Sequence, residues 1–414
     1  MNVPPSSEPG PLVHSSPTAA DGPRIPLYSP EFAADPHRCY RDMRDRYGPL
    51  VPVLLAPQVP ATLVIGYHTA LRILNDPSRF PADPRLWQQH IPGDCPVLLQ
   101  LGWRPTASRS AGPEFERYRQ ATTAGIDAID LYALHDLVEQ MAIPLINTFC
   151  TTGSANLLSQ YVYPLVCQVI NSLLGCPPEI GHRLMAGTTT VGDGMDVEAG
   201  NQIVFEALRE LVALKRVEPG NDMTTVIMRH PAGLDEFELV NQVGQIYGTC
   251  IEILLHLIAN TLLTIITDDR VGSGVVGGSL SVRGALDGVL FDDPPLANLL
   301  VSYPRQPILI DGVWLPAHQP VVISMAGCNN DPAIRTTDQI GNRAHLAWGV
   351  GPHACPAQSA AYLIAQDAID QLLDALPDMR LDPEFGPPTW RTGPFYRALN
   401  ALPVTFPRSA VLHI

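Results

Sequence analysis

The hydrophobic and polar positions of the chain predict a mixed N-terminal part followed by a long helical stretch. Between Leu131 and Thr267, apolar residues recur at spacings of three and four, which is the periodicity of helices that bury one face. Glycine and proline interrupt this pattern at 175–178 and 219–222, where we expect helices to end. The predicted helices are Leu134–Thr148, Leu157–Leu174, Gln202–Glu218 and Leu234–Thr267.

The flanking segments carry shorter patterns. Before the helical stretch, the sequence predicts a charged amphipathic helix, a strand pair joined by a proline-bearing turn, and a further helix. Residues 81–110 are rich in Pro, Trp and Gly without a clear period, which predicts a long loop or a broken helix. Residues 268–293 are rich in glycine and predict a connector. The first three elements are expected at 35–47, 50–65 and 67–75.

The last long helix contains the chain's most apolar run, Ile251–Ile266. This run is short for a membrane span and carries Glu252, His256 and Asn260 at four-residue spacing, which places them on one helix face. The pattern favours a buried core helix with one polar stripe over a bilayer segment. Asp235 and Glu238 predict the capping of its N-terminus.

Composition limits the classes of partner. The net charge of −15 argues against nucleic acid and against an anionic membrane surface. Eight scattered cysteines without a C-x-x-C pair predict reduced thiols and a cytoplasmic protein. Residues 1–25 are Pro/Ser-rich and lack the charged and apolar regions of a signal peptide, so we expect a disordered tail before one domain at 26–414.

The most informative stretch is 348–357, WGVGPHACPA, which precedes a predicted helix at Ala360–Leu376. Gly349 and Gly351 permit positive φ angles in a tight turn, and Cys355 lies where unpaired helical N–H groups favour a thiolate. This arrangement is typical of a site that holds a soft, anionic sulfur ligand. A lone cysteine, however, is more often a small buried hydrophobe.

Residues 348–357 resemble the haem-binding loop of cytochromes P450, in which the cysteine thiolate is the proximal iron ligand. Gly349, Gly351, His353 and Cys355 match that loop, Trp348 stands in the phenylalanine position, and an alanine replaces the last glycine. The resemblance extends over about 26–407. It implies a mainly α fold, a helical prism with a small β-rich lobe, that binds haem b through Cys355 as the metal ligand.

The resemblance also implies residues that bind the haem propionates. His353 and Arg119 are expected in this role, with Arg305 as a further candidate, and Phe115 replaces the histidine of the family's His-x-x-x-Arg pair. Without the resemblance, Arg119 reads equally well as a surface charge on a helix. In the family the 81–110 region caps the substrate pocket, which makes pocket candidates of Leu86, Trp87, Leu98, Leu99 and Trp103.

The long helix resembles the distal P450 helix marked A-G-x-[DE]-T. Thr249 to Ile253 take those five positions, so Cys250 replaces the glycine, Glu252 keeps the acid and Ile253 replaces the threonine that assists oxygen protonation. These three residues are the expected catalytic set, and Glu252 is either a proton relay or a satisfied core acid. Asn298 and Val301 replace the family's Glu-x-x-Arg pair, so the chain resembles an atypical bacterial branch without that pair or the threonine.

Two functions remain open at this point. The first is a haem-thiolate monooxygenase that oxidises a small apolar substrate with electrons from a ferredoxin and its reductase, or with peroxide because the distal threonine is lost. The second is a non-catalytic P450-like protein that binds or regulates a protein partner. The retained loop residues, Cys355 above all, favour the enzyme.

Overall fold

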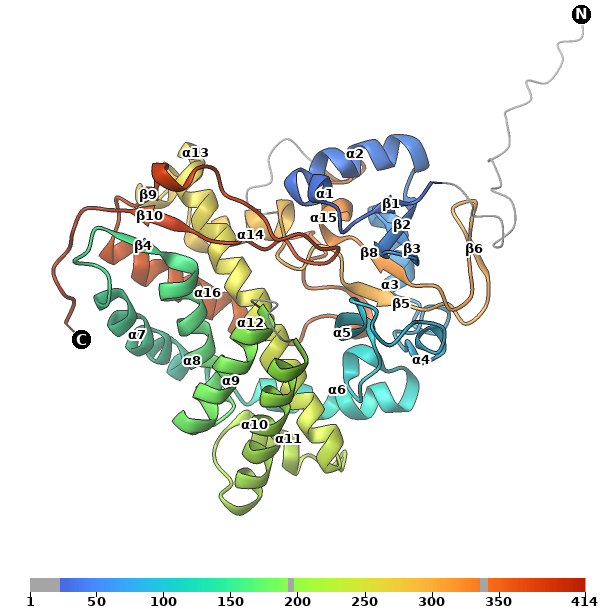
Figure 1. Ribbon diagram of the computed structural model, residues 1–414, viewed down its shortest axis with the longest axis horizontal. Helices are drawn as coiled ribbons and strands as arrows, with labels where there is room; N and C mark the ends of the chain where they lie inside the picture. The colour runs from blue at the N-terminus through green and yellow to red at the C-terminus, as the bar shows by residue number, and fades with distance from the viewer. Residues whose placement is uncertain (1–22, 193–196, 336–341, 414) are drawn as a thin grey trace, which may run out of the picture.

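Helices make up most of the computed structural model, which describes residues 23–192, 197–335 and 342–413. A β-rich lobe lies at one side, and the larger helical part lies at the other (Figure 1). The helices are α1 (Pro30–Ala34), α2 (Pro36–Tyr47), α3 (Tyr67–Leu74), α4 (Arg85–Gln88), α5 (Leu98–Leu101), α6 (Gly112–Asp127), α7 (Leu131–Asn147), α8 (Tyr163–Leu173), α9 (Pro178–Gly192), α10 (Val197–Val217), α11 (Met223–Arg229), α12 (Glu236–Thr267), α13 (Asp269–Val276), α14 (Val282–Asp292), α15 (Met325–Asn329) and α16 (Gln358–Ala375). Shorter turns of helix are η1 (Ala107–Arg109), η2 (Leu158–Val162), η3 (Gly351–His353) and η4 (Pro383–Phe385).

The sheets join parts of the chain that are far apart in sequence. A five-stranded sheet has the order β1-β2-β3-β8-β5, in which β8 pairs in parallel with β3 and antiparallel with β5. A three-stranded sheet has the order β4-β10-β9, and β6 and β7 form a hairpin. The strands are β1 (Ile25–Pro26), β2 (Leu50–Ala56), β3 (Val59–Val64), β4 (Ser154–Asn156), β5 (Leu300–Ser302), β6 (Ile308–Ile310), β7 (Val313–Leu315), β8 (Val321–Ile323), β9 (Arg380–Leu381) and β10 (Pro403–Thr405).

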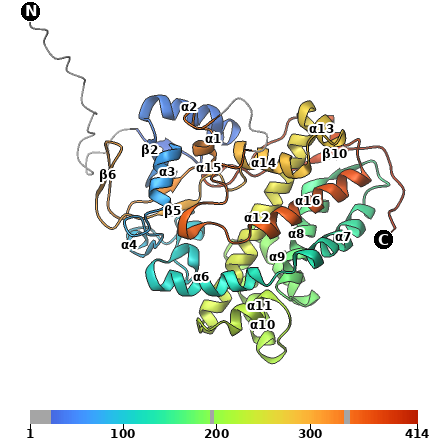
Figure 2. The ribbon, with the colours of Figure 1, turned by 180° about the vertical axis from the view of Figure 1, so that it is seen from behind.

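Helix α12 is the central element of the helical part. It crosses the molecule beside α16, which in turn packs on α7 (Figure 2). The predicted capping box is present, because the Asp235 side chain accepts from the Glu238 N–H and the Glu238 side chain accepts from the Asp235 N–H. Among the described residues α12 alone is long and apolar enough to cross a membrane, yet 56% of its most apolar window is buried in the protein. Core packing accounts for its hydropathy.

Most of the predicted elements are present, with two corrections. The glycine-rich segment 268–293 is not a connector but forms α13 and α14, whose N-termini are capped by Asp268 and Ser281. The predicted tail, 1–25, falls outside the described residues as far as residue 22, but Ile25 already belongs to β1 and pairs with Val53. The predicted boundary between residues 25 and 26 therefore falls inside β1.

The segment that replaces the expected Glu-x-x-Arg helix is extended. Residues 294–299 contain no helix, and Val301 lies in β5. Asn298 is buried, and both ends of its side-chain amide have a partner: its Oδ1 accepts from Tyr40 Oη at 3.0 Å, and its Nδ2 donates to the Pro394 carbonyl at 2.9 Å. Neutral hydrogen bonds thus occupy the place of the ion pair.

Candidate active site

The cysteine loop is held by backbone geometry that requires glycine. Gly349 and Gly351 have φ angles of 68° and 72°, in the left-handed region, and a Cβ on Gly351 would lie 2.5 Å from the Leu74 carbonyl oxygen. The Cys355 N–H donates to the Trp348 carbonyl at 2.7 Å and closes the loop. The loop therefore presents the Cys355 side chain at a fixed position just before α16.

The surroundings of the Cys355 sulfur combine burial with donors. Burial raises the pKa of the Cys355 thiol, while a hydrogen bond from the Ala357 N–H and the Arg119 guanidinium act in the opposite direction. The backbone N–H at the start of α16 favours the thiolate, in line with the sequence-based expectation, but burial outweighs it. A metal cation at the sulfur would supply the missing stabilisation.

Trp348, in the phenylalanine position, is anchored from behind the loop. Its ring packs on Tyr362 with centroids 5.2 Å apart, and its indole N–H donates to Tyr362 Oη at 3.3 Å. Tyr362 Oη donates in turn to the buried Asp287 carboxylate at 2.5 Å. The larger ring is accommodated because its polar atom has a partner.

The predicted propionate ligands are only partly brought together. Arg119 and His353 both line the cavity in front of the loop, and Arg119 donates to the Ala354 carbonyl. Phe115 packs on the His353 ring at 4.3 Å between centroids but is not part of the cavity wall. Burial, with Arg119, lowers the pKa of His353 to about 4, so the imidazole is neutral. Arg305 is exposed and away from the cavity, which removes the geometric basis for its predicted role.

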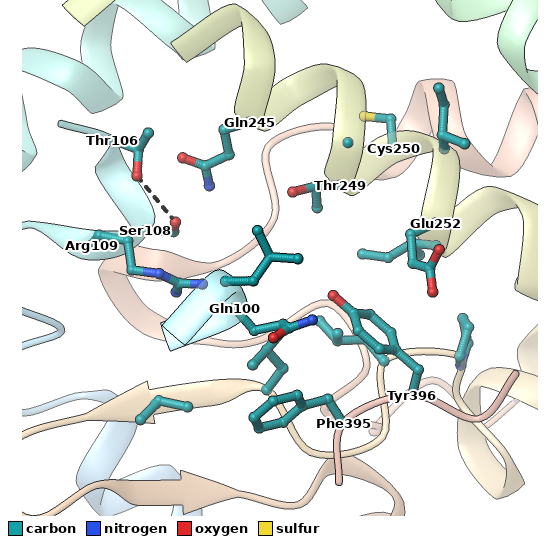
Figure 3. Close-up of a pocket in the computed structure, with 18 of the residues that line it drawn as sticks. Gln100, Thr106, Ser108, Arg109, Gln245, Thr249, Cys250, Glu252, Phe395 and Tyr396 are labelled. Atoms are coloured by element: carbon teal, nitrogen blue, oxygen red, sulfur yellow. Dashed lines mark hydrogen bonds between the residues drawn. The ribbon is translucent and has the colours of Figure 1, made fainter. Parts of the chain in front are cut away.

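Helix α12 forms another part of the cavity wall. Thr249, Cys250, Glu252 and Ile253 all line it, and the first three are labelled in Figure 3. Glu252 forms an ion pair with Arg391, and its Oε1 lies 3.6 Å from His256 Nε2. Burial opposes ionisation of Glu252, but His256 and Arg391 outweigh it and lower its pKa to about 2. Glu252 is therefore a charged, paired acid.

The loop 81–110 contributes to the cavity in a way that its sequence only partly predicted. Leu98 and Leu99 line the wall, whereas Leu86 is 49% exposed. Trp87 is buried against Tyr303, and Trp103 stacks under Arg85. The pocket candidates of this loop thus reduce to the residues of α5.

The cavity has a volume of about 2,030 Å³. Ligand pockets are commonly about 300–1,000 Å³, so this one has space for a large cofactor together with a substrate. No cluster of three or more His, Cys, Asp or Glu side chains within the described residues can hold a metal, so a metal at Cys355 needs a cofactor to supply further ligands. Donors without an acidic partner, Arg119 and His353, lie at the same cavity. These features fit haem.

The polar residues of this cavity wall to which sequence reasoning gave no role include Arg109, Arg391 and Thr249. Helical spacing could have found Thr249, because it lies four residues before Ile253 and therefore on the same face of α12. Arg109 ends the short helical turn η1 and Arg391 lies in an irregular segment, and neither stretch is long enough to show a periodicity that predicts where its side chains point.

Comparison with known proteins agrees with this geometry, although no family model matches the chain. It is 26% identical over 408 residues to cytochrome P450 107B1 of Saccharopolyspora erythraea, an alignment that covers 94% of this chain and 99% of the relative. It is 25% identical over 393 residues to the cytochrome P450 monooxygenase PikC of Streptomyces venezuelae, covering 91% and 92%. The solved structure of CYP154A1 from Streptomyces coelicolor superposes with a TM-score of 0.82 at 24% identity, covering 92% of this chain and all of that one.

A mainly helical fold with a partly buried cysteine loop at a cavity large enough for haem and substrate fits the class of haem-thiolate proteins. The chain belongs to the bacterial cytochrome P450 superfamily. Its cofactor is haem b, and its activity is that of a haem-thiolate monooxygenase.

Proposed function

We propose that the protein hydroxylates a mainly apolar organic molecule, with Cys355 as the iron ligand and with electrons from a ferredoxin and ferredoxin reductase in the cytoplasm. The observation that carries this proposal is the cavity of about 2,030 Å³, which is lined both by Cys355 and by residues 249–253 of α12. Aliphatic side chains such as Leu99, Val240 and Leu299 line much of it, and this favours an apolar substrate.

The residues around the loop hold the cofactor. Bound haem supplies the iron that activates oxygen. The Ala357 N–H donates to the Cys355 sulfur, which tempers the charge on a thiolate ligand. Arg119 provides a cation for one propionate, and the neutral His353 imidazole provides an N–H donor.

Thr249 is the group that we assign to proton transfer on the distal side. Ile253 cannot form a hydrogen bond, but Thr249 lies one helical turn earlier on the same face of α12, and its side chain is exposed to the cavity. Its Oγ1 can pass a proton between cavity water and the reacting oxygen. Glu252 fits this task less well, because an acid with a pKa of about 2 that is paired with Arg391 holds no proton at neutral pH.

A change at Thr249 should therefore uncouple electron use from product formation. Thr249→Val is expected to lower the yield of product per electron consumed by about tenfold or more, since the proton donor is lost. Ile253→Thr is expected to raise that yield. Thr264→Val is the matched control on the same helix, because the Thr264 hydroxyl donates to the Asn260 carbonyl and does not line the cavity. Equal coupling in Thr249→Val and in the control would remove the assignment.

The proposed function itself is tested by a spectrum followed by turnover. The reduced, carbon monoxide-bound protein should show the red-shifted Soret band of thiolate ligation, and Cys355→Ala should abolish it. The holoprotein with ferredoxin, its reductase and NADPH should then convert members of a panel of steroids, macrolides and fatty alcohols to products with one added oxygen atom. Turnover with hydrogen peroxide, but none with ferredoxin, its reductase and NADPH, would contradict the ferredoxin partner. A protein that takes up no haem during expression with a haem precursor would contradict the enzyme.

A further inference from the structure

Arg109 is a cation without an anionic partner in the cavity wall. It is the last residue of η1, and its guanidinium points into the cavity between Gln100 and Gln245 (Figure 3). Its side chain has no ion pair or hydrogen bond to any other residue in the part of the chain that the structure describes. Arg109 is only partly buried, but a molecule that fills the cavity would remove its guanidinium from water, which costs free energy unless an anion or several acceptors pair with it.

The charges around Arg109 do not compensate it. Burial lowers the pKa of Arg109, the neighbouring Arg104 adds to this, and Tyr303 and Tyr396 act in the opposite direction; no carboxylate contributes. Among the described residues, the acids of the cavity wall are Asp94, Glu198 and Glu252. The first two are exposed, and the third is paired with Arg391. An anion at Arg109 must therefore come from a bound molecule.

The neighbours of Arg109 are neutral groups that can share an anion with it. Ser108 lies beside it, with Oγ 3.4 Å from Thr106 Oγ1, and the amide side chains of Gln100 and Gln245 approach the same space (Figure 3). Apolar side chains such as Leu99, Val240 and Leu299 contribute much of the remaining wall. The cavity thus has one polar, cationic end in an apolar enclosure, which matches a molecule with an apolar body and a single anionic group.

This cationic end is separate from the propionate-binding residues. Arg119 interacts electrostatically with Cys355, whereas Arg109 interacts with Tyr303 and Tyr396. Tyr396 in turn lies near Glu252 on the α12 side of the cavity. Arg109 therefore faces the space available to a substrate and not the cysteine loop.

We propose that Arg109 binds the carboxylate of an otherwise apolar substrate and so orients it in the cavity. This inference rests on the proposed function, because it names the substrate class of the same site. The planar fork of an arginine suits a carboxylate, which accepts two parallel hydrogen bonds from it. Desolvation strengthens such an ion pair, so Arg109 would bind acids more tightly than the corresponding alcohols.

The experiment is an optical titration of the haem-loaded enzyme with myristic acid and with myristyl alcohol, which differ only in the terminal group. The shift of the haem band on binding gives the two dissociation constants. Arg109→Gln should bind the acid about tenfold to a hundredfold more weakly than the wild type, because a charge-assisted hydrogen bond is lost, and should bind the alcohol equally well. Arg109→Lys should recover part of the affinity for the acid, since it restores charge without the fork.

Arg305→Gln is the matched control, because it removes the same charge from an exposed position outside the cavity. It should leave both dissociation constants unchanged. The inference is overturned if Arg109→Gln binds the acid as tightly as the wild type. It is also overturned if Arg109→Gln purifies with much less haem than the control, because the carboxylate at Arg109 is then a haem propionate. Oxidation of the alcohol without any Arg109-dependent binding of the acid would leave the proposed function intact and remove only the substrate class.

Discussion

His345 illustrates how the interior of the protein fixes the charge of a single residue. It is 8% exposed and lies beside Phe291, with ring centroids 6.4 Å apart. Neither ring nitrogen has a hydrogen-bond partner among the described residues. Burial lowers the pKa of His345, because an imidazolium there would be desolvated and unpaired.

The lowered pKa of His345 predicts that the folded protein loses stability in mild acid. The unfolded chain protonates the imidazole as the pH falls through about 6.5, whereas the folded chain does not, so the unfolded state binds more protons and folding is penalised. The stability of the wild type should fall relative to that of His345→Phe by up to about 1.4 kcal/mol per pH unit below pH 6.5. Urea unfolding of both proteins, above and below that pH, measures the difference. A difference that does not change with pH would show that His345 is protonated in the fold.

For single residues, the sequence predicted the cysteine loop and the charged residues Arg119 and Glu252, but it missed Arg109 and Arg391 in the same cavity wall. Gly349, Gly351 and Cys355 could be assigned because their chemistry depends on neighbours in sequence. The partner of Glu252 could not be predicted, because Arg391 is 139 residues away and meets it only in the folded chain. Without that contact, the sequence could not decide whether Glu252 is a proton relay or a satisfied core acid.

Among helices and strands, those determined by their own sequence were predicted, and those determined by distant contacts were missed. Helix α12 was predicted with its cap, since both the apolar period and the capping residues are local. Helices α13 and α14 were missed, because glycine-rich segments have weak helix propensity. Burial of Leu286 and Val289 in the same core cluster as α12 and α16 overrides that propensity in α14. The tertiary contact that decides the element is not visible in its own sequence.

Because η3 packs against the end of α3, replacing Gly351 by alanine should cost more unfolding free energy than the same change at Gly386. Gly351→Ala places a Cβ 2.5 Å from the Leu74 carbonyl oxygen and also strains a φ of 72°. Gly386 has a φ of 74°, but a Cβ there meets nothing within 4 Å, so Gly386→Ala isolates the backbone strain. We expect Gly386→Ala to cost about 1–2 kcal/mol of unfolding free energy and Gly351→Ala to cost about 1–3 kcal/mol more.

The measurement is denaturant unfolding of both variants together with their haem content after purification. Gly351→Ala should lose haem as well as stability, because the loop that it distorts presents Cys355. Gly386→Ala should keep its haem. Equal losses in the two variants would mean that the Leu74 contact does not hold the loop in place.

For the whole molecule, the missing Glu-x-x-Arg pair means that hydrogen bonds of Asn298, and not an ion pair, join distant parts of the chain at this position. The sequence predicted that both charged partners are absent, and the fold persists without them. It could not predict the replacement, in which Asn298 connects α2 with the C-terminal turn at 394–395 that lines the cavity. Those contacts span 258 and 96 residues along the chain, so only the folded topology brings them together.

This connection predicts an energetic coupling between Tyr40 and Asn298. Tyr40→Phe leaves the buried Asn298 Oδ1 without its donor and should cost about 1–3 kcal/mol. Asn298→Ala should cost more, because it also leaves the Pro394 carbonyl unpaired and opens a void. The double variant should lose about 0.5–1.5 kcal/mol less unfolding free energy than the two single variants lose together. This difference is the net contribution of the shared hydrogen bond. Urea unfolding of the four proteins gives this coupling. A value of zero would mean that α2 and the cavity turn are held independently, and that the ion pair was lost without any replacement.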